Sequence, residues 1–207
     1  MIGTHTQVER RASFEGLAAP ALQLLLANAL LILCAKIAIP VPGTPVPITL
    51  QTFGVMLIAI LFGARTAALA SLLYLVEGAA GLPVFQPFGA VATMRLFGPT
   101  AGYLLAFPPA AFITGRLVEL LSTRAPQSAP ADANVVTRNL SGWIPVGAAL
   151  VPGQVVIFLC GWAWLASLIG AAPAFRLGVL PFLAGDLLKL AAAAAVARSV
   201  RVKIPVK

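Results

Sequence analysis

The most constraining feature of this sequence is a succession of apolar segments, rich in leucine, alanine and valine, that fill most of its 207 residues. A helix that crosses the ~30 Å hydrocarbon core of a bilayer needs about 20 such residues. Only 10% of the residues are charged, whereas soluble domains carry roughly 25%. Spans of a membrane β-barrel alternate polar and apolar residues, and these segments do not. The sequence therefore predicts an all-α, polytopic membrane protein without a separate water-facing domain.

Glycines, prolines and polar residues divide the apolar sequence into six predicted membrane spans. The spans are residues 21–39, 49–62, 66–80, 100–121, a stretch within 143–169, and 178–197. Proline-rich residues 41–47 are predicted to be extended, because each proline removes a backbone donor. Residues 81–98 are apolar but broken by glycine and proline, so their backbone must be covered by protein or line a cavity. Residues 122–142 are predicted to form a polar loop, and Pro108 and Pro109 to kink the fourth span.

The positions of the 14 lysines and arginines predict the orientation of the chain in the cell membrane. With both termini in the cytoplasm, ten of these residues lie on the inner side, and two, Arg95 and Arg176, on the outer side. Cytoplasmic loops carry an excess of such residues. We therefore divide the chain into a cytoplasmic tail at 1–20, a six-helix membrane domain at 21–198 and a basic cytoplasmic tail at 199–207. The scatter of the basic residues at segment ends favours this role over nucleic-acid binding.

Two ionisable residues in the last predicted span are the main candidates for function. Asp186 and Lys189 lie three positions apart in the outer half of that span, so they share one face of the helix. Charged groups within a membrane cost at least about 2.5 kcal/mol and commonly mark a functional site. The pair offers an acceptor-only carboxylate beside an ammonium with three donors. These properties favour a ligand-binding role, and a structural ion pair between helices is the alternative.

Other polar and aromatic residues are expected near the same outer level of the membrane. Arg95, in the irregular segment, suits a carboxylate ligand, with contact to lipid headgroups as the alternative. Gln51 and Thr52 open the second span, where they either cap the helix or face a ligand. The aromatic residues expected at this level are Tyr74, Tyr103, Phe85 and Phe88. A few polar groups within an apolar wall are typical of a small-molecule pocket.

The remaining ionisable and reactive residues predict structural roles rather than catalysis. Glu77 is expected to pair with Lys36 at a similar depth in the membrane. Cys34 and Cys160 lie in apolar runs, where buried cysteines usually act as small apolar residues. His5 is the single histidine of the sequence and lies in its polar N-terminal part. The sequence contains no catalytic constellation, metal-ligand cluster or phosphate-binding loop, so we expect neither an enzyme nor a bound metal or cofactor.

Four motifs, in this order along the chain, resemble those of the BioY proteins. They are Pro-Val-Pro-Ile-Thr-Leu-Gln-Thr-Phe at residues 45–53, Gly-Leu-Pro-Val-Phe at 81–85, Gly-Pro-Thr-Ala-Gly-Tyr-Leu at 98–104 and Gly-Asp-Leu-Leu-Lys at 185–189. The resemblance extends over roughly residues 21–197. BioY proteins are the biotin-specific substrate-binding (S) components of energy-coupling factor (ECF) transporters. The resemblance implies a six-helix bundle that captures biotin from outside the cell with high affinity.

The resemblance also implies which residues contact the ligand. Asp186 and Lys189 are the expected contacts, and their acceptor and donors suit the ureido ring of biotin. Arg95 is the expected partner of the biotin carboxylate, and aromatic side chains such as Phe85 are expected to pack on the fused rings. Further contacts are expected at residues that match the motifs or their edges, namely Gln51, Thr52, Gln86, Thr100 and Tyr103.

Partner proteins are implied as well: a transmembrane coupling protein and two cytoplasmic ATPase subunits that supply the energy. S components commonly dock through small residues on the first helix. Here the first span offers only Cys34 and Ala38 as such a pair, so Gly63 with Ala67 and Ala64 with Ala68 are alternatives. Three other functions stay open at this point. The cargo could be another vitamin or a biotin precursor such as dethiobiotin, transport could proceed without the ATPases, or the protein could be a membrane scaffold.

Overall fold

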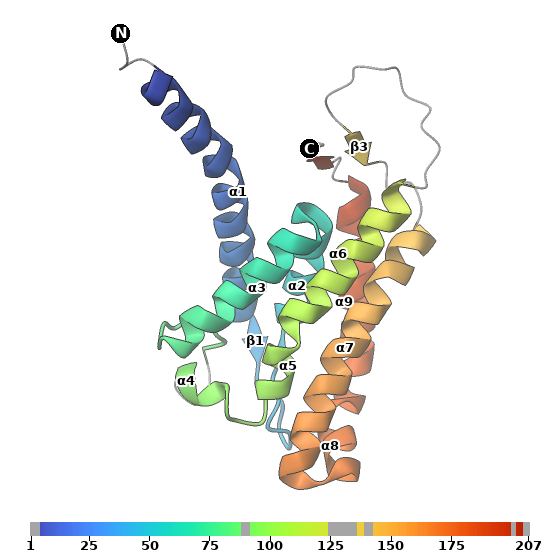
Figure 1. The fold of residues 1–207 in the computed structure, drawn as a ribbon. Helices are drawn as coiled ribbons and strands as arrows, with labels where there is room; N and C mark the ends of the chain where they lie inside the picture. The colour runs from blue at the N-terminus through green and yellow to red at the C-terminus, as the bar shows by residue number, and fades with distance from the viewer. Residues whose placement is uncertain (1–4, 88–91, 124–135, 139–142, 200–201, 205–207) are drawn as a thin grey trace.

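The computed structural model describes residues 5–87, 92–123, 136–138, 143–199 and 202–204, which form a mostly helical bundle (Figure 1). Its elements are α1 (His5–Lys36), β1 (Ala38–Ile39), β2 (Ile48–Thr49), α2 (Gln51–Phe62), α3 (Ala64–Ala79), α4 (Ala92–Arg95), α5 (Ala101–Leu105), α6 (Phe107–Thr123), β3 (Val136–Arg138), α7 (Trp143–Ile169), α8 (Ala171–Gly178), the 3-10 helix η1 (Leu180–Phe182), α9 (Leu183–Ser199) and β4 (Val202–Ile204). The start of α1 and the strand β4 lie at the same end of the bundle (Figure 1).

Four helical stretches of the described residues are long and apolar enough to cross a membrane. They are Ala18–Lys36, Ala101–Leu121, Val146–Ile169 and Ala171–Ala197. Helices α2 and α3 have 12 and 16 residues, fewer than the about 20 that a straight crossing needs. The prediction of a helical protein with several membrane spans is confirmed. Six crossings, and cytoplasmic placement of both termini, stay predictions. The position of the start of α1 and of β4 at one end of the bundle agrees with an even number of crossings.

The short helix α2 lies at the centre of the bundle. It packs against α1, α3, α6, α7 and α9, and Val55, Met56, Ile58 and Ala59 are fully buried. A helix that is covered by protein on all sides exchanges its lipid contacts for packing contacts. Its length is therefore not set by the thickness of the hydrocarbon core. This position also places its first residues among the walls of the other helices.

The observed elements differ from the predicted spans near the N-terminus and in the fourth span. Helix α1 begins at His5, so the described part of the predicted tail at 1–20 is helical. The predicted fourth span is divided at Ala106 into α5 and α6. Pro108 and Pro109 lie in the first turn of α6, where their missing N–H groups need no helical partner. The interruption of the span therefore falls beside the two prolines, where the sequence predicts a kink.

The last span and the polar loop also differ from the prediction. Gly178, predicted to begin the last span, ends α8, and η1 with Pro181 separates it from α9. In the predicted loop at 122–142, α6 continues to Thr123, and β3 pairs antiparallel with β4, with Val136 opposite Ile204. The rest of this loop lies outside the described residues. A pairing between segments so distant in sequence leaves no local signal in either one.

The turn between α2 and α3 consists of Gly63 alone. Its φ of 81° is a conformation that glycine adopts without strain. Helix α3 then begins at Ala64, whose backbone N–H donates to Glu119 Oε1 on α6 at 2.9 Å. Ala64 and Ala67 are buried at this contact between α3 and α6. Gly63, Ala64 and Ala67 are buried within the chain, whereas Ala68 is partly exposed. A docking face at Gly63 with Ala67 or at Ala64 with Ala68 stays a prediction.

The predicted ion pair between Glu77 and Lys36 does not form. Glu77 Oε2 accepts a hydrogen bond from Asn28 Nδ2 at 3.1 Å. Lys36 Nζ donates to the backbone oxygens of Pro83 and Phe85. Asn28 precedes Lys36 by about 12 Å along α1, so Glu77 lies deeper in the bundle than Lys36. The ammonium of Lys36 instead attaches the irregular segment after α3 to the end of α1.

Candidate functional site

The β1–β2 hairpin and the start of α2 form one polar wall of a pocket. Thr49 Oγ1 accepts a hydrogen bond from the backbone N–H of Gln51 at 3.2 Å and donates to Gln51 Oε1 at 3.0 Å. Gln51 Nε2 in turn donates to the hydroxyl of Tyr74 on α3 at 2.6 Å. Both ends of the buried Gln51 amide are thus held, which fixes the orientation of its donor and acceptor.

Asp186 and Lys189 form the opposite polar wall, on the first turns of α9. Lys189 Nζ lies 2.5 Å from Asp186 Oδ1, and both side chains are largely buried. Thr52 on α2 bridges the pair, with its Oγ1 3.4 Å from Asp186 Oδ1 and 3.4 Å from Lys189 Nζ. Gln154 on α7 donates from Nε2 to Asp186 Oδ2 at 2.6 Å. Three helices therefore converge on one carboxylate, which lowers the cost of keeping it inside an apolar bundle.

Aromatic side chains separate the two polar walls. Tyr103 on α5 donates from its hydroxyl to the backbone oxygen of Gly178 at 2.7 Å, so the ring is fixed against the α8–η1 junction. Phe107, at the start of α6, stacks on Tyr74 with a centroid distance of 6.4 Å. Phe158 on α7 and Phe182 in η1 complete the apolar surface. Rings held at these positions offer flat faces to a ligand with an apolar body.

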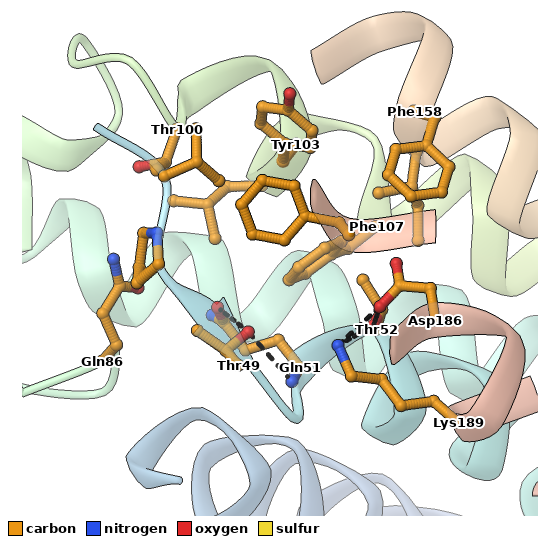
Figure 2. Close-up of a pocket in the computed structure, with 15 residues that line it drawn as sticks. Thr49, Gln51, Thr52, Gln86, Thr100, Tyr103, Phe107, Phe158, Asp186 and Lys189 are labelled. Carbon is orange, nitrogen blue, oxygen red and sulfur yellow. Dashed lines mark hydrogen bonds and ion pairs between the residues drawn. The ribbon is translucent and has the colours of Figure 1, made fainter. Parts of the chain in front are cut away.

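These walls enclose a cavity of about 510 Å³, its open mouth included. Figure 2 shows Asp186 and Lys189 at one side of the cavity, Gln86 and Thr100 at the other, and Phe107 between them. The complete lining consists of Val46, Pro47, Thr49, Gln51, Thr52, Gln86, Thr100, Tyr103, Leu104, Phe107, Ile157, Phe158, Phe182, Asp186 and Lys189. The cavity has a charged end and a neutral polar end.

Most of the residues predicted to contact a ligand meet at this cavity. Those that line it are Gln51, Thr52, Gln86, Thr100, Tyr103, Asp186 and Lys189. Phe85 does not line it, because its ring packs edge-on against Tyr74 at 5.0 Å and fills the space beside Gly78. Phe88, one of the aromatic residues expected nearby, lies outside the described residues. The structure therefore brings together motifs that are up to 140 residues apart in the sequence.

Arg95 is also absent from the residues that line the cavity. It lies at the end of α4, and only 7% of it is exposed. Burial lowers the pKa of its guanidinium, and the nearby phenol of Tyr74 acts in the opposite direction. Tyr74 in turn contacts Gln51, which lines the cavity. Arg95 is therefore linked to the cavity through Tyr74 and Gln51 rather than by lining it.

Sequence reasoning missed several residues of the site. Gln154 carried a usable signal, because it is a polar side chain inside an apolar helix. In the structure only 5% of Gln154 is exposed. Phe107 and Phe158 carried none, because aromatic residues are common throughout such helices. Val46 and Pro47 belong to a motif that was noted, but their apolar side chains gave no reason to place them in a pocket. Among the described residues no group of three or more His, Cys, Asp or Glu side chains forms a metal site.

Comparison with known proteins gives the family of this chain. The profile of the BioY family matches residues 9–205. The chain belongs to the BioY family. Among BioY relatives, the "Probable biotin transporter BioY" of Pyrococcus horikoshii is 38% identical over 154 residues, which cover 74% of this chain and 79% of the relative. The "Biotin transporter BioY" of Rhodobacter capsulatus is 38% identical over 173 residues, covering 79% and 82%.

The fold of this BioY chain also occurs in a solved structure. The structure is the "S-component for biotin from an ECF-type ABC transporter", with a TM-score of 0.73 and 21% sequence identity. The match covers 97% of this chain and 95% of the other. It confirms the S-component-like bundle expected from the sequence. With its apolar helical stretches and its BioY relatives, the chain is a multi-pass protein of the cell membrane.

Proposed function

We propose that this chain captures biotin with high affinity at the outer side of the membrane, as the substrate-binding component of an ECF-type transporter. The single observation that carries the proposal is the cavity with a charged end at Asp186 and Lys189 and a neutral polar end at Gln86 and Thr100. Biotin has the matching outline, with a cyclic urea at one end, a carboxylate at the other and an apolar body between. The names of the curated BioY relatives support the same cargo.

The charged end suits the urea of biotin. A cyclic urea presents two N–H donors and one carbonyl acceptor on one edge. Asp186 supplies an acceptor for an N–H group, and Lys189 supplies a donor for the carbonyl. The two groups now bind each other at 2.5 Å, so the urea would replace one ion pair with hydrogen bonds to both partners. Hydrogen bonds to charged groups contribute about 1.5–3 kcal/mol each, which favours the exchange in a site that excludes water.

The neutral end suits the carboxylate of biotin. Gln86 and Thr100 supply donors at the wall of the cavity. Arg95 interacts electrostatically with Tyr74, which accepts a hydrogen bond from Gln51 of the lining. A guanidinium that does not touch a carboxylate but lies within the same protein interior still attracts it, because the effective dielectric constant there is well below that of water. Arg95 would therefore favour an anionic ligand without direct contact in the described conformation.

A thermal-shift experiment on the purified protein in detergent tests the proposed cargo. Ligand that binds only the folded state stabilises it, by about 4 kcal/mol at a thousandfold excess over Kd. We expect biotin at micromolar concentration to raise the melting temperature, and dethiobiotin and other water-soluble vitamins to raise it less. A larger shift with another vitamin would indicate that this vitamin, and not biotin, is the cargo. No shift with any of them would favour a purely structural polar core and contradict the proposal.

The contribution of Arg95 can be measured with biotin and its neutral amide. We expect the wild-type protein to bind biotin about tenfold more tightly than biotinamide, because only biotin carries a negative charge. The Arg95→Gln variant should reduce this preference to about twofold, mainly by weakening the binding of biotin. Competition against labelled biotin provides both affinities. An unchanged preference in Arg95→Gln would show that Arg95 has no part in recognising the carboxylate.

Energy coupling is the remaining part of the proposal. We infer that a transmembrane coupling protein and two cytoplasmic ATPase subunits drive release of biotin into the cell, with this chain as the capturing subunit. Uptake of labelled biotin in cells that lack other biotin transport, with and without co-expressed coupling subunits, tests this point. Uptake that needs the coupling subunits supports the proposal. Equal uptake without them would favour a transporter that works alone.

A further inference from the structure

Gln154 is a buried polar residue that the proposed contacts with biotin do not use. It lies in the apolar stretch Val146–Ile169 of α7, which has a mean hydropathy of 1.8. Only 5% of Gln154 is exposed, and it is not among the residues that line the cavity. Burying an amide in an apolar helix bundle costs free energy unless the amide is hydrogen-bonded. Gln154 makes its bond to Asp186, with Nε2 2.6 Å from Oδ2.

The hydrogen bonds to Asp186 divide between its two oxygens. Lys189 and Thr52 both contact Oδ1, at 2.5 and 3.4 Å. Gln154 contacts Oδ2. Lys189 and Thr52 line the cavity and can turn toward a ligand, whereas Gln154 lies behind the carboxylate on another helix. A ligand donor that displaces Lys189 from Oδ1 therefore leaves the bond to Oδ2 in place.

We propose that Gln154 is a positioning residue that holds the Asp186 carboxylate at the angle required to accept a ligand N–H group. This inference rests on the proposed function. Because the amide is neutral, it orients the carboxylate without cancelling its charge, and so leaves Asp186 in need of a further donor. Because Gln154 and Asp186 are both buried and belong to α7 and α9, their bond also fixes one wall of the pocket against another. A preorganised acceptor binds a ligand more tightly because less freedom is lost on binding.

The test compares three variants in binding of labelled biotin. Gln154→Met keeps the length of the side chain and removes the donor, and we expect biotin affinity to fall by about 10- to 100-fold. Thr114→Val is the matched control, since Thr114 is fully buried on α6 and donates to Met56 Sδ without contacting Asp186. We expect its affinity to stay within about twofold of wild type. Melting temperatures without ligand report on folding for each variant.

The Gln154→Glu variant is tested by the pH dependence of its biotin affinity. This pH dependence would not differ from that of wild type if Gln154 had only a structural role. The charged groups that face position 154 are Asp186 and, beyond it, Lys189, both from α9, while α2 contributes the neutral Thr52. Near neutral pH two carboxylates would repel each other, and biotin should bind at least as weakly as to Gln154→Met. As the pH falls and residue 154 takes up a proton, its O–H can donate to Asp186. The affinity relative to wild type at the same pH should then recover.

Each outcome separates this inference from the proposed function. If wild type binds biotin and Gln154→Met binds it equally well, the positioning role is wrong and the function stands. An equal loss in Thr114→Val, or a deficit of Gln154→Glu that does not change with pH, would also overturn the positioning role. If the wild-type protein does not bind biotin, the proposed function itself is wrong. Should Gln154→Met fail to fold, the pH profile of Gln154→Glu decides the question.

Discussion

Replacing Asp186 by alanine is expected to weaken the binding of labelled biotin by about 100-fold or more. The substitution removes the acceptor proposed for the urea N–H and leaves the ammonium of Lys189 beside Thr52 without its carboxylate. Truncating one partner of a buried, hydrogen-bonded charge pair costs about 2–5 kcal/mol, which corresponds to a loss of this size. Asp186→Asn keeps an acceptor of similar shape and should lose less. Equilibrium binding in detergent gives both affinities.

A second ion pair of the same spacing provides the control for Asp186→Ala. Arg116 and Glu119 on α6 lie three positions apart, with Nη1 3.0 Å from Oε2. The Arg116 side chain is 55% exposed, and neither residue lines the cavity. Exposed pairs contribute little to stability, so Arg116→Ala should bind biotin within about twofold of wild type. Equal biotin affinities of Asp186→Ala and wild type would show that Asp186 does not take part in binding biotin. Similar losses of biotin affinity in Asp186→Ala and Arg116→Ala would indicate a general effect of breaking an ion pair.

The Gly115→Val substitution is expected to prevent stable folding or to lower the melting temperature sharply. A side chain at this position of α6 would place its Cβ 2.4 Å from Ala64 Cα and 2.5 Å from Ala64 N on α3. Both are backbone atoms, so they cannot rotate away, and the two helices must separate. Overpacking of a well-packed core typically costs 1–3 kcal/mol and occasionally more. The yield of monodisperse protein and its melting temperature in detergent measure the effect.

Gly147→Val on α7 is the matched control for Gly115→Val. No atom lies within 4 Å of a Cβ built at Gly147. Both substitutions replace a helical glycine by valine, so they change the intrinsic helix propensity equally. The difference between them isolates the close contact of α3 with α6. Gly147→Val should melt within a few degrees of wild type. A Gly115→Val protein as stable as Gly147→Val would mean that α3 and α6 do not pack this closely.

The outline of the fold could be predicted because its signals are local. Membrane helices follow from runs of apolar residues, and α7 occupies the region within which the fifth span was predicted. The shared face of Asp186 and Lys189 follows from helical periodicity alone. Boundaries that depend on other segments could not be predicted in this way. The end of α8 at Gly178 and the pairing of β3 with β4 are examples.

The candidate site also combines residues that could be predicted from the sequence with side-chain orientations that could not. The motifs indicated Gln51, Gln86, Thr100 and Tyr103 as residues of interest, and the structure places all four at the cavity. The motifs carried no information on the rotation of each helix about its own axis. Phe85, expected in the site, turns toward Tyr74 instead.

The sequence by itself determined that this chain is a helical membrane protein of the BioY family with a carboxylate and an ammonium on one helix face. Only the tertiary structure decided their neighbours. It placed Gln154 behind Asp186, gave Lys36 two backbone carbonyls in place of Glu77, and left Arg95 out of the cavity lining. The physical reason is that apolar character and periodicity act within a helix. The partner of a buried polar group is chosen by how separate helices pack against one another, and each of these contacts joins residues more than 20 positions apart.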